Sequence, residues 1–121
     1  MKALVLSEHG DLDKLGLVKD KPVPQPGDGE VLVRVGASSF NYHDIFTVRG
    51  MPGIRVPLPV VIGLDIAGTV VEDAGEWKAG DRVMVNPLRA GIGLMGEMVD
   101  GGMEEYVVVS ADQLFRIPDN V

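Results

Sequence analysis

The stretch Gly63-Leu64-Asp65-Ile66-Ala67-Gly68-Thr69-Val70-Val71-Glu72 is the most informative part of this 121-residue chain. It follows the apolar run Val60-Val61-Ile62, so Gly63 marks a tight turn, and an acidic residue stands two places on. The β-branched residues that end the stretch predict a strand over Ile66–Glu72. Gly68 lies inside this strand pattern, where a glycine usually marks a bulge or a close approach by another backbone.

The composition is that of one acidic globular domain. A chain of this length can bury its own core, and 45% hydrophobic with 24% charged residues is an ordinary balance. The formal net charge of −7 repels phosphate backbones, so we do not expect a nucleic-acid partner. The apolar runs are far shorter than the ~18 residues of a membrane span. No signal peptide is visible, so we expect a cytoplasmic protein without a membrane partner.

The sequence predicts many short strands and one short helix. Sixteen glycines and eight prolines favour strands and turns over long helices. About seven strands are expected, at the spacing of a small barrel or sandwich. They cover residues 1–7, 15–19, 30–36, 66–72, 82–86, 103–109 and 114–117. The best helix candidate is Asn41–Val48, which Ser39 or Asn41 can cap and which Gly50 and Pro52 end.

Segment 88–102 is rich in glycine and is expected to be irregular. Within it, Gly91-Ile92-Gly93-Leu94-Met95-Gly96 matches the G-x-G-x-x-G fingerprint of dinucleotide binding. That fingerprint works only where a strand ends at the glycines and a helix N-terminus then faces the pyrophosphate. Here four residues separate the match from Gly101-Gly102, which halts any helix. We therefore interpret the match as a loop and not as a cofactor site.

Three motifs together resemble the N-terminal, GroES-like catalytic domain of the medium-chain dehydrogenase/reductase family. They are Gly63–Glu72, Ser39-Phe40-Asn41-Tyr42-His43-Asp44 and Lys78-Ala79-Gly80-Asp81-Arg82-Val83. The resemblance covers essentially the whole chain and is strongest to the zinc-free quinone oxidoreductase branch. It implies a mainly β fold, a GroES-like, partly open β-barrel with one or more short helices, in which residues 1–121 form a single substrate-side domain.

The resemblance also implies that no zinc is bound. In zinc-dependent relatives the helix start reads Cys-His-Thr/Ser-Asp, and its cysteine binds the catalytic metal, whereas this chain has Asn41 there. The second ligand in those relatives is the histidine of Gly-His-Glu. Here that position is Leu64, which cannot bind a metal. The segment 86–102 stands in place of the relatives' structural-zinc lobe and has no cysteine. We expect neither a catalytic nor a structural zinc.

The resemblance makes Asn41 and Tyr42 the implied catalytic and cofactor-binding residues. In the quinone oxidoreductases this asparagine and tyrosine line the nicotinamide and substrate pocket. Asn41 can donate and accept hydrogen bonds, and Tyr42 can hydrogen-bond a carbonyl oxygen. The alternative is that Asn41 only caps the helix and that Tyr42 belongs to the core. Leu64 and Asp65 are the expected substrate-pocket residues.

His43 and Asp44 are two further catalytic candidates. His43 falls where the zinc enzymes place a proton-relay hydroxyl, and a histidine can relay protons near neutral pH. Turnover of a His43→Gln variant that is unchanged across pH would dispose of this role. Asp44 either faces Asp65 as a pair or only orients the helix start. A metal site from His43, Asp44 and Asp65 is not expected, because the first two are helix neighbours that point apart.

The chain contains no credible dinucleotide-binding unit. The resemblance implies that NADP or NAD is bound mainly by a Rossmann domain absent from this chain. The chain is then expected to be a fragment of a longer two-domain enzyme, a homodimer in its full-length form, that acts on a small carbonyl or quinone. Alone, the domain is expected to be inert. In this family the C-terminal end of the full chain returns to complete the catalytic domain, so an exposed edge or apolar patch and self-association are also implied.

A second hypothesis belongs to a different functional class. The same resemblance to a GroES-like fold is compatible with a binding or scaffold module that has no enzymatic activity, because a fold alone does not fix a function. Heptamers on native mass spectrometry would support this alternative, and monomers or dimers would not.

Overall fold

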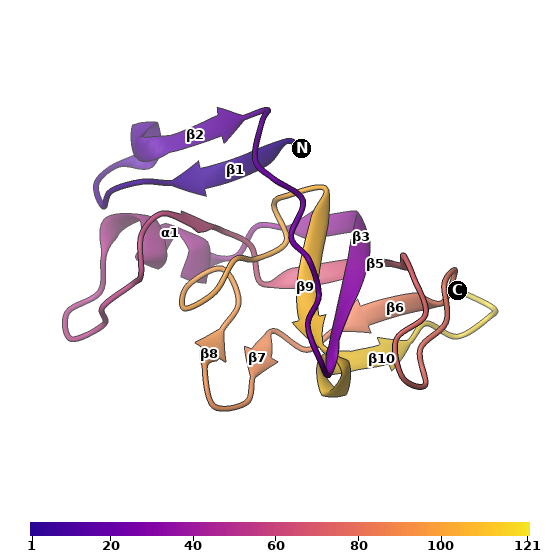
Figure 1. Cartoon of the computed structure of the whole chain (residues 1–121). Helices are drawn as coiled ribbons and strands as arrows, with labels where there is room; N and C mark the ends of the chain where they lie inside the picture. Colours follow the sequence, from indigo (N-terminus) through magenta and orange to yellow (C-terminus); the bar gives the residue numbers. More distant parts are fainter.

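The computed structural model describes all residues from 1 to 121. It shows a small sheet standing above a single helix, α1 (Tyr42–Arg49), beside a larger curled sheet (Figure 1). The small sheet has the order β2-β1-β4 and consists of β1 (Ala3–Leu6), β2 (Leu15–Val18) and β4 (Val60–Val61). The larger sheet has the order β10-β6-β5-β3-β9 and consists of β3 (Glu30–Ser39), β5 (Asp65–Val70), β6 (Arg82–Val85), β9 (Tyr106–Ser110) and β10 (Leu114–Arg116).

The expected mainly β, GroES-like fold is confirmed. The helix lies one residue further along than predicted, and Gly50 caps its C-terminus. Three two-residue strands were not predicted: β4, and the hairpin formed by β7 (Leu88–Arg89) and β8 (Gly93–Leu94). Strands of this length are too short to show an alternating pattern. Two 3-10 turns, η1 (Leu12–Lys14) and η2 (Ala111–Gln113), complete the fold, and none of its helices has the length and apolar character needed to cross a bilayer.

Gly68 is required where two central strands approach closely. The register between β3 and β5 shifts between Val35 and Ala37, so β3 is bulged at that point. Gly68 pairs with Val35 there, and a Cβ atom on Gly68 would overlap the backbone carbonyl of Arg34. The prediction of a bulge or close approach at Gly68 is therefore confirmed. A bulge bends its strand, and β3 continues beyond it to Ser39, at the edge of the site described below.

Two apolar clusters form the core. Eleven buried residues fill the larger sheet: Val31, Val33, Ile66, Val70, Trp77, Val83, Val85, Met95, Val107, Val109 and Leu114. Five others pack around the small sheet and α1: Leu6, Val48, Val56, Val60 and Ile62. Because Val48 belongs to the second cluster, α1 is anchored near its C-terminal end, and its first turn lies beside the junction of the two sheets.

The glycines of segment 88–102 serve backbone packing and a hairpin. A Cβ atom on Gly96 would lie 2.7 Å from the backbone nitrogen of Gly63, and one on Gly101 would overlap the Gly63 carbonyl oxygen. The first two glycines of the G-x-G-x-x-G match lie in the β7–β8 hairpin, and no helix follows the third. The structure thus supports the interpretation of this match as a loop.

Candidate functional site

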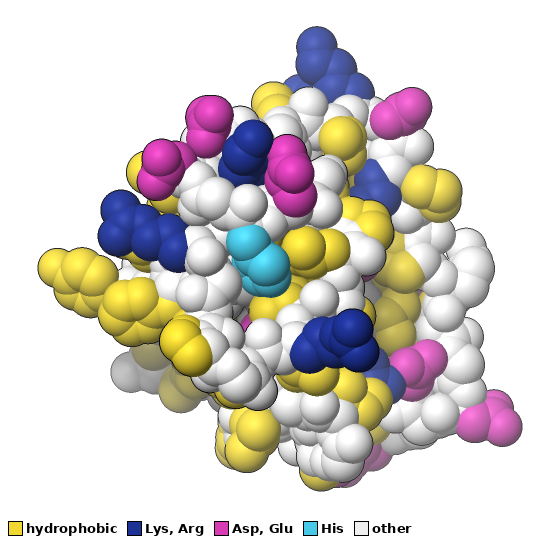
Figure 2. Space-filling model, turned by 90° about the vertical axis from the view of Figure 1, so that its left-hand side faces the viewer, with side chains coloured by type: hydrophobic (Ala, Val, Ile, Leu, Met, Phe, Trp, Pro, Cys, Tyr) yellow, Lys and Arg dark blue, Asp and Glu magenta, His cyan; other side chains and the backbone are white.

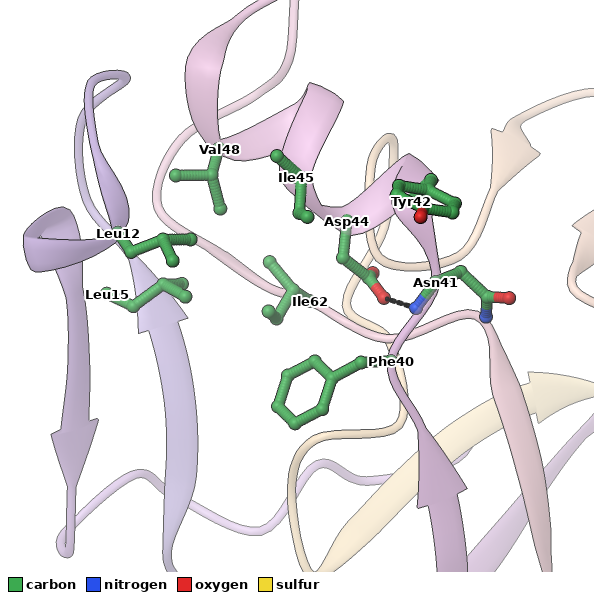
Figure 3. A pocket seen from close by; sticks show the side chains of 9 residues that line it. All are labelled: Leu12, Leu15, Phe40, Asn41, Tyr42, Asp44, Ile45, Val48 and Ile62. Atoms are coloured by element: carbon green, nitrogen blue, oxygen red, sulfur yellow. Dashed lines mark hydrogen bonds between the residues drawn. The ribbon is translucent and has the colours of Figure 1, made fainter.

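The first turn of α1 is tied to the turn at Gly63 by a buried carboxylate. Asp44 is 2% exposed, and its Oδ2 accepts the backbone N–H of Asn41 at 2.8 Å (Figure 3). Its Oδ1 accepts the backbone N–H of Gly63 at 3.1 Å. Of the two roles considered for Asp44, this geometry is that of orienting the helix start. Asp44 and Asp65 do not pair directly, because Asn41 lies between them.

Asn41 occupies the N-cap position of the helix and forms a capping box with Asp44. Its Nδ2 also donates to Asp65 Oδ2 at 2.9 Å. The same carboxylate oxygen accepts the Ser39 hydroxyl at 2.8 Å. These two bonds, that from Asn41 first, lower the pKa of Asp65 below its ordinary value, so Asp65 is ionised at neutral pH. Two of the predicted site residues, Asn41 and Asp65, are therefore in direct contact.

An open hollow of about 350 Å³ lies beside this contact. It is lined by Ala37, Ser38, Ser39, Asp65, Ile66, Ala67, Met84 and Val85. Tyr42, which begins α1, is 80% exposed, so it is not a core residue. Leu64 is half-buried in the turn that precedes Asp65. The polar Asn41–Asp65 contact and the free phenol of Tyr42 thus come from adjacent ends of β3, β5 and α1.

His43 is paired with a residue that the sequence analysis did not single out. Its Nε2 lies 2.7 Å from Oε2 of Glu97, whose side chain is 9% exposed. The orientation of the two groups does not meet the angular requirement of a hydrogen bond, so the contact is one of charge when His43 is protonated. The pair connects α1 to the segment that follows β8. The only sequence signal for Glu97 is its place directly after the packing glycine Gly96.

A second, larger and apolar hollow of about 700 Å³ lies on the other side of the helix start. Its lining residues are Leu12, Leu15, Phe40, Asn41, Tyr42, Asp44, Ile45, Val48 and Ile62. The apolar side chains face one another across it, whereas the amide of Asn41 points away from it (Figure 3). Figure 2, in which the left-hand side of Figure 1 faces the viewer, shows hydrophobic side chains at the surface beside charged ones.

Four exposed side chains form what we call the apolar patch: Leu12, Phe40, Tyr42 and Phe46. They are between 52% and 80% exposed. Three of them line the larger hollow, and Phe46 stands one helical turn after Tyr42. Exposed apolar side chains are therefore present at this face, and their coverage by another part of a longer chain stays a prediction.

The residues at the site do not fit the catalytic zinc of zinc-dependent dehydrogenases. Asn41 directs its amide nitrogen to Asp65, and Leu64 has no donor atom. No group of three or more His, Cys, Asp or Glu side chains is arranged to hold a metal ion. The expectation that the protein works without zinc stays a prediction, which metal analysis of the purified chain can test.

Comparisons with known proteins identify relatives of this fold. The chain matches the family model of the alcohol dehydrogenase GroES-like domain over residues 27–119. It is 37% identical to the mouse synaptic vesicle membrane protein VAT-1 homolog, covering 98% of this chain and 28% of that protein. It is 32% identical to the quinone oxidoreductase of Lama guanicoe, covering 98% of this chain and 34% of the relative.

Solved structures of known proteins also include relatives of this fold. A crystal structure of an NAD-dependent alcohol dehydrogenase matches with a TM-score of 0.89 and 31% identity, over 100% of this chain and 40% of that one. The chain thus spans less than half the length of each of these relatives.

Proposed function

Because the chain belongs to the alcohol dehydrogenase GroES-like domain family, we propose that it is the substrate-side domain of a zinc-independent, NAD(P)H-dependent oxidoreductase that acts on a small carbonyl or quinone. The family includes quinone oxidoreductases and alcohol dehydrogenases. The choice of this site as the place of reaction rests on one observation. Asn41 is held by Asp65 at the edge of an open hollow, and Tyr42, the next residue along the chain, has an exposed side chain.

The proposed chemistry divides between the cofactor and the residues of this chain. NAD(P)H supplies the hydride, and the protein supplies orientation and hydrogen bonds. Tyr42 donates its phenolic O–H to the carbonyl oxygen, on which negative charge develops as hydride reaches the carbon. Asn41 would hold the nicotinamide amide, and Leu64 and Asp65 would line the substrate pocket. His43 delivers the proton that neutralises the product oxygen, and Glu97 holds His43 in place.

The proposal requires a second domain for cofactor binding. Every pair of strands in this fold is antiparallel, so the fold has no βαβ unit of the kind that binds dinucleotides. We propose that NADP or NAD is bound mainly by a separate Rossmann domain and that the 121 residues alone are inert. We further propose that the complete enzyme is a cytoplasmic homodimer, which cell fractionation and sedimentation analysis can test.

The proposed function can be tested by removing the hydroxyl group of Tyr42. We would fuse this chain to the nucleotide-binding domain of the Lama guanicoe quinone oxidoreductase and measure quinone-dependent oxidation of NADPH. Tyr42→Phe should lower kcat by about 100-fold, the usual effect of removing one oxyanion donor. The matched control is Tyr106→Phe, which changes the other tyrosine of the chain, half-buried in β9, and should leave kcat unchanged. Equal kcat values for the two variants would refute the proposed role of Tyr42.

The apolar patch favours one alternative, a non-enzymatic binding or scaffold module. Contiguous exposed apolar side chains often mark a protein interaction surface. Native mass spectrometry separates the two functions. Ring-shaped assemblies such as heptamers would support the module, and a monomer or dimer would not.

A further inference from the structure

Two arginines lie on either side of Thr69, on the outer face of the larger sheet. β5 runs between β3 and β6, and the register sets Arg34 of β3 and Arg82 of β6 directly opposite Thr69. Residues that are directly opposite in an antiparallel pair point to the same face of the sheet. The next residue of β5, Val70, belongs to the core, so Thr69 and both arginines face outward, and both arginines are exposed.

No carboxylate of the chain neutralises this row. Neither of its two guanidinium groups forms an ion pair within the chain. Two acidic residues adjoin the row along the strands, and both bind elsewhere. Asp81 pairs with Arg116 at 3.1 Å, and Glu105 accepts the backbone N–H of Lys2 at 2.6 Å. In a chain of net charge −7, the row is therefore a local cationic site.

The spacing of the strands lets both guanidinium groups reach one anion. Neighbouring strands are about 4.8 Å apart, so the Cα atoms of Arg34 and Arg82 are about 10 Å apart with Thr69 midway. Guanidinium groups bind phosphate oxygens through parallel N–H donors, and the hydroxyl of Thr69 adds a further donor. We propose that Arg34, Thr69 and Arg82 bind a phosphate group of the ligand that occupies the open hollow.

The phosphate site continues the open hollow along the same face of the sheet. Ala67 and Met84 line the hollow, lie opposite each other and form the row next to Thr69 and Arg82. Asp65 begins the same strand and marks the polar end of the hollow, about 13 Å from Thr69 at the usual rise of a strand. A ligand that is held at both ends therefore spans this distance over an apolar floor.

This inference rests on the proposed function for the source of the phosphate group. In an NAD(P)H-dependent reaction, the phosphate belongs either to the cofactor or to the carbonyl substrate. Both sources present the same charge and the same acceptor oxygens to the two arginines. The chemistry of the site is thus the same in either case, and kinetics of the fusion protein separate the two sources.

Inorganic phosphate is the probe for the 121-residue chain, and NMR at constant ionic strength follows the arginine Nε–Hε signals. Those of Arg34 and Arg82 should move together to saturation. Arg34→Gln or Arg82→Gln should weaken binding about 10-fold or more, the effect of losing hydrogen bonds to a charged group. Thr69→Val should weaken it about 5-fold. The matched control, Arg55→Gln, removes an equal charge from an exposed arginine in the loop before β4 and should leave binding unchanged.

Two results of this titration would overturn the inference. Equal weakening by Arg34→Gln and Arg55→Gln would show only a general attraction between phosphate and positive charge. Arginine signals that never reach saturation would show that the chain holds no phosphate site.

The fusion protein identifies the source of the phosphate. Arg82→Gln should raise one KM by about 10-fold. A raised KM for NADPH, measured with a neutral quinone, assigns the site to the cofactor, and a raised KM for glyceraldehyde 3-phosphate assigns it to the substrate. No change in either KM would overturn the inference. Absence of hydride transfer in the fusion, with phosphate binding intact in the chain, would refute the proposed function and leave the phosphate site standing.

Discussion

Oε2 of Glu97 lies 2.7 Å from Nε2 of His43, and this contact connects the glycine-rich segment after β8 to the first turn of α1. Glu97 is almost completely buried, whereas His43 keeps a quarter of its side chain exposed. The segment is also held by Met95, which is fully buried in the core of the larger sheet, and by backbone contacts with the turn at Gly63. The pair therefore adds a contact between side chains that joins this segment to the helix start.

The two side chains should be energetically coupled. In a double-mutant cycle with His43→Gln and Glu97→Gln, urea unfolding should give a coupling energy of about 1–2 kcal/mol. The control is Glu8→Gln, which removes the partner of Lys14 in a solvent-exposed pair and should leave stability unchanged. Additive effects of the two single changes would show that the contact contributes nothing.

Glu104 should make the stability of the fold depend on pH near neutrality. Its side chain is 1% exposed and lies 3.1 Å from Nζ of Lys21, which also contacts Asp100. Burial raises the pKa of Glu104 from 4.5 to about 7, against the opposing attraction of Lys21. The folded chain thus binds this proton more tightly than the unfolded chain. The resulting stabilisation is complete below pH 4.5 and is lost as pH rises through about 7.

A comparison with Glu104→Gln isolates this effect from the other carboxylates. Between about pH 5 and about pH 8, the wild-type chain should lose up to about 3 kcal/mol of unfolding free energy relative to the variant. Urea unfolding at the two pH values measures the difference. A difference that stays constant, or that grows in favour of the wild type at high pH, would contradict the raised pKa.

Gly68 should tolerate no side chain. In Gly68→Ala the new methyl group would overlap the Arg34 carbonyl, so β3 and β5 must separate, and we expect a loss of about 3 kcal/mol or more. Gly16, in the edge strand β2, is the matched control because a Cβ atom there meets nothing within 4 Å. Gly16→Ala should leave the melting temperature unchanged or raise it slightly. Equal melting temperatures for the two variants would refute the close approach.

The apolar patch should make the isolated chain self-associate. Phe46 is 52% exposed and lines neither hollow, so Phe46→Gln should weaken association without disturbing the site. The control is Val71→Gln, which changes another exposed apolar residue, outside the patch. Sedimentation velocity over a range of concentrations measures the effect. Association that Val71→Gln weakens as much as Phe46→Gln does would show that the patch is not the contact surface.

The sequence predicted those features that arise from local patterns. Strand alternation, the turn at Gly63 and the helix with Gly50 behind it were all visible in runs of a few residues. The close approach at Gly68 was also predictable, because a glycine weakens the interior of a strand and usually stands there to admit another backbone or a bulge. The family resemblance added Asn41 and Asp65 as members of one site, and the structure places them in contact.

The remaining features depend on contacts between distant segments. Glu97 is 54 positions from His43 along the chain, and nothing in the intervening residues predicts that they meet. Asn41 was predicted as a capping residue of α1, yet its amide nitrogen also binds Asp65, which is 24 positions away along the chain. That charged partner is reached only when β5 is folded beside β3.

Hydride transfer in the fusion of this chain with the nucleotide-binding domain of the Lama guanicoe quinone oxidoreductase tests the proposed substrate-side role most directly. We predict oxidation of NADPH that requires a quinone or a small carbonyl and that neither part performs alone. The contrary result is a fusion protein that is folded and binds NADPH, as judged by its fluorescence, yet transfers no hydride above the rate of the nucleotide-binding domain by itself. That result would contradict the assignment of this domain as the substrate side of an oxidoreductase.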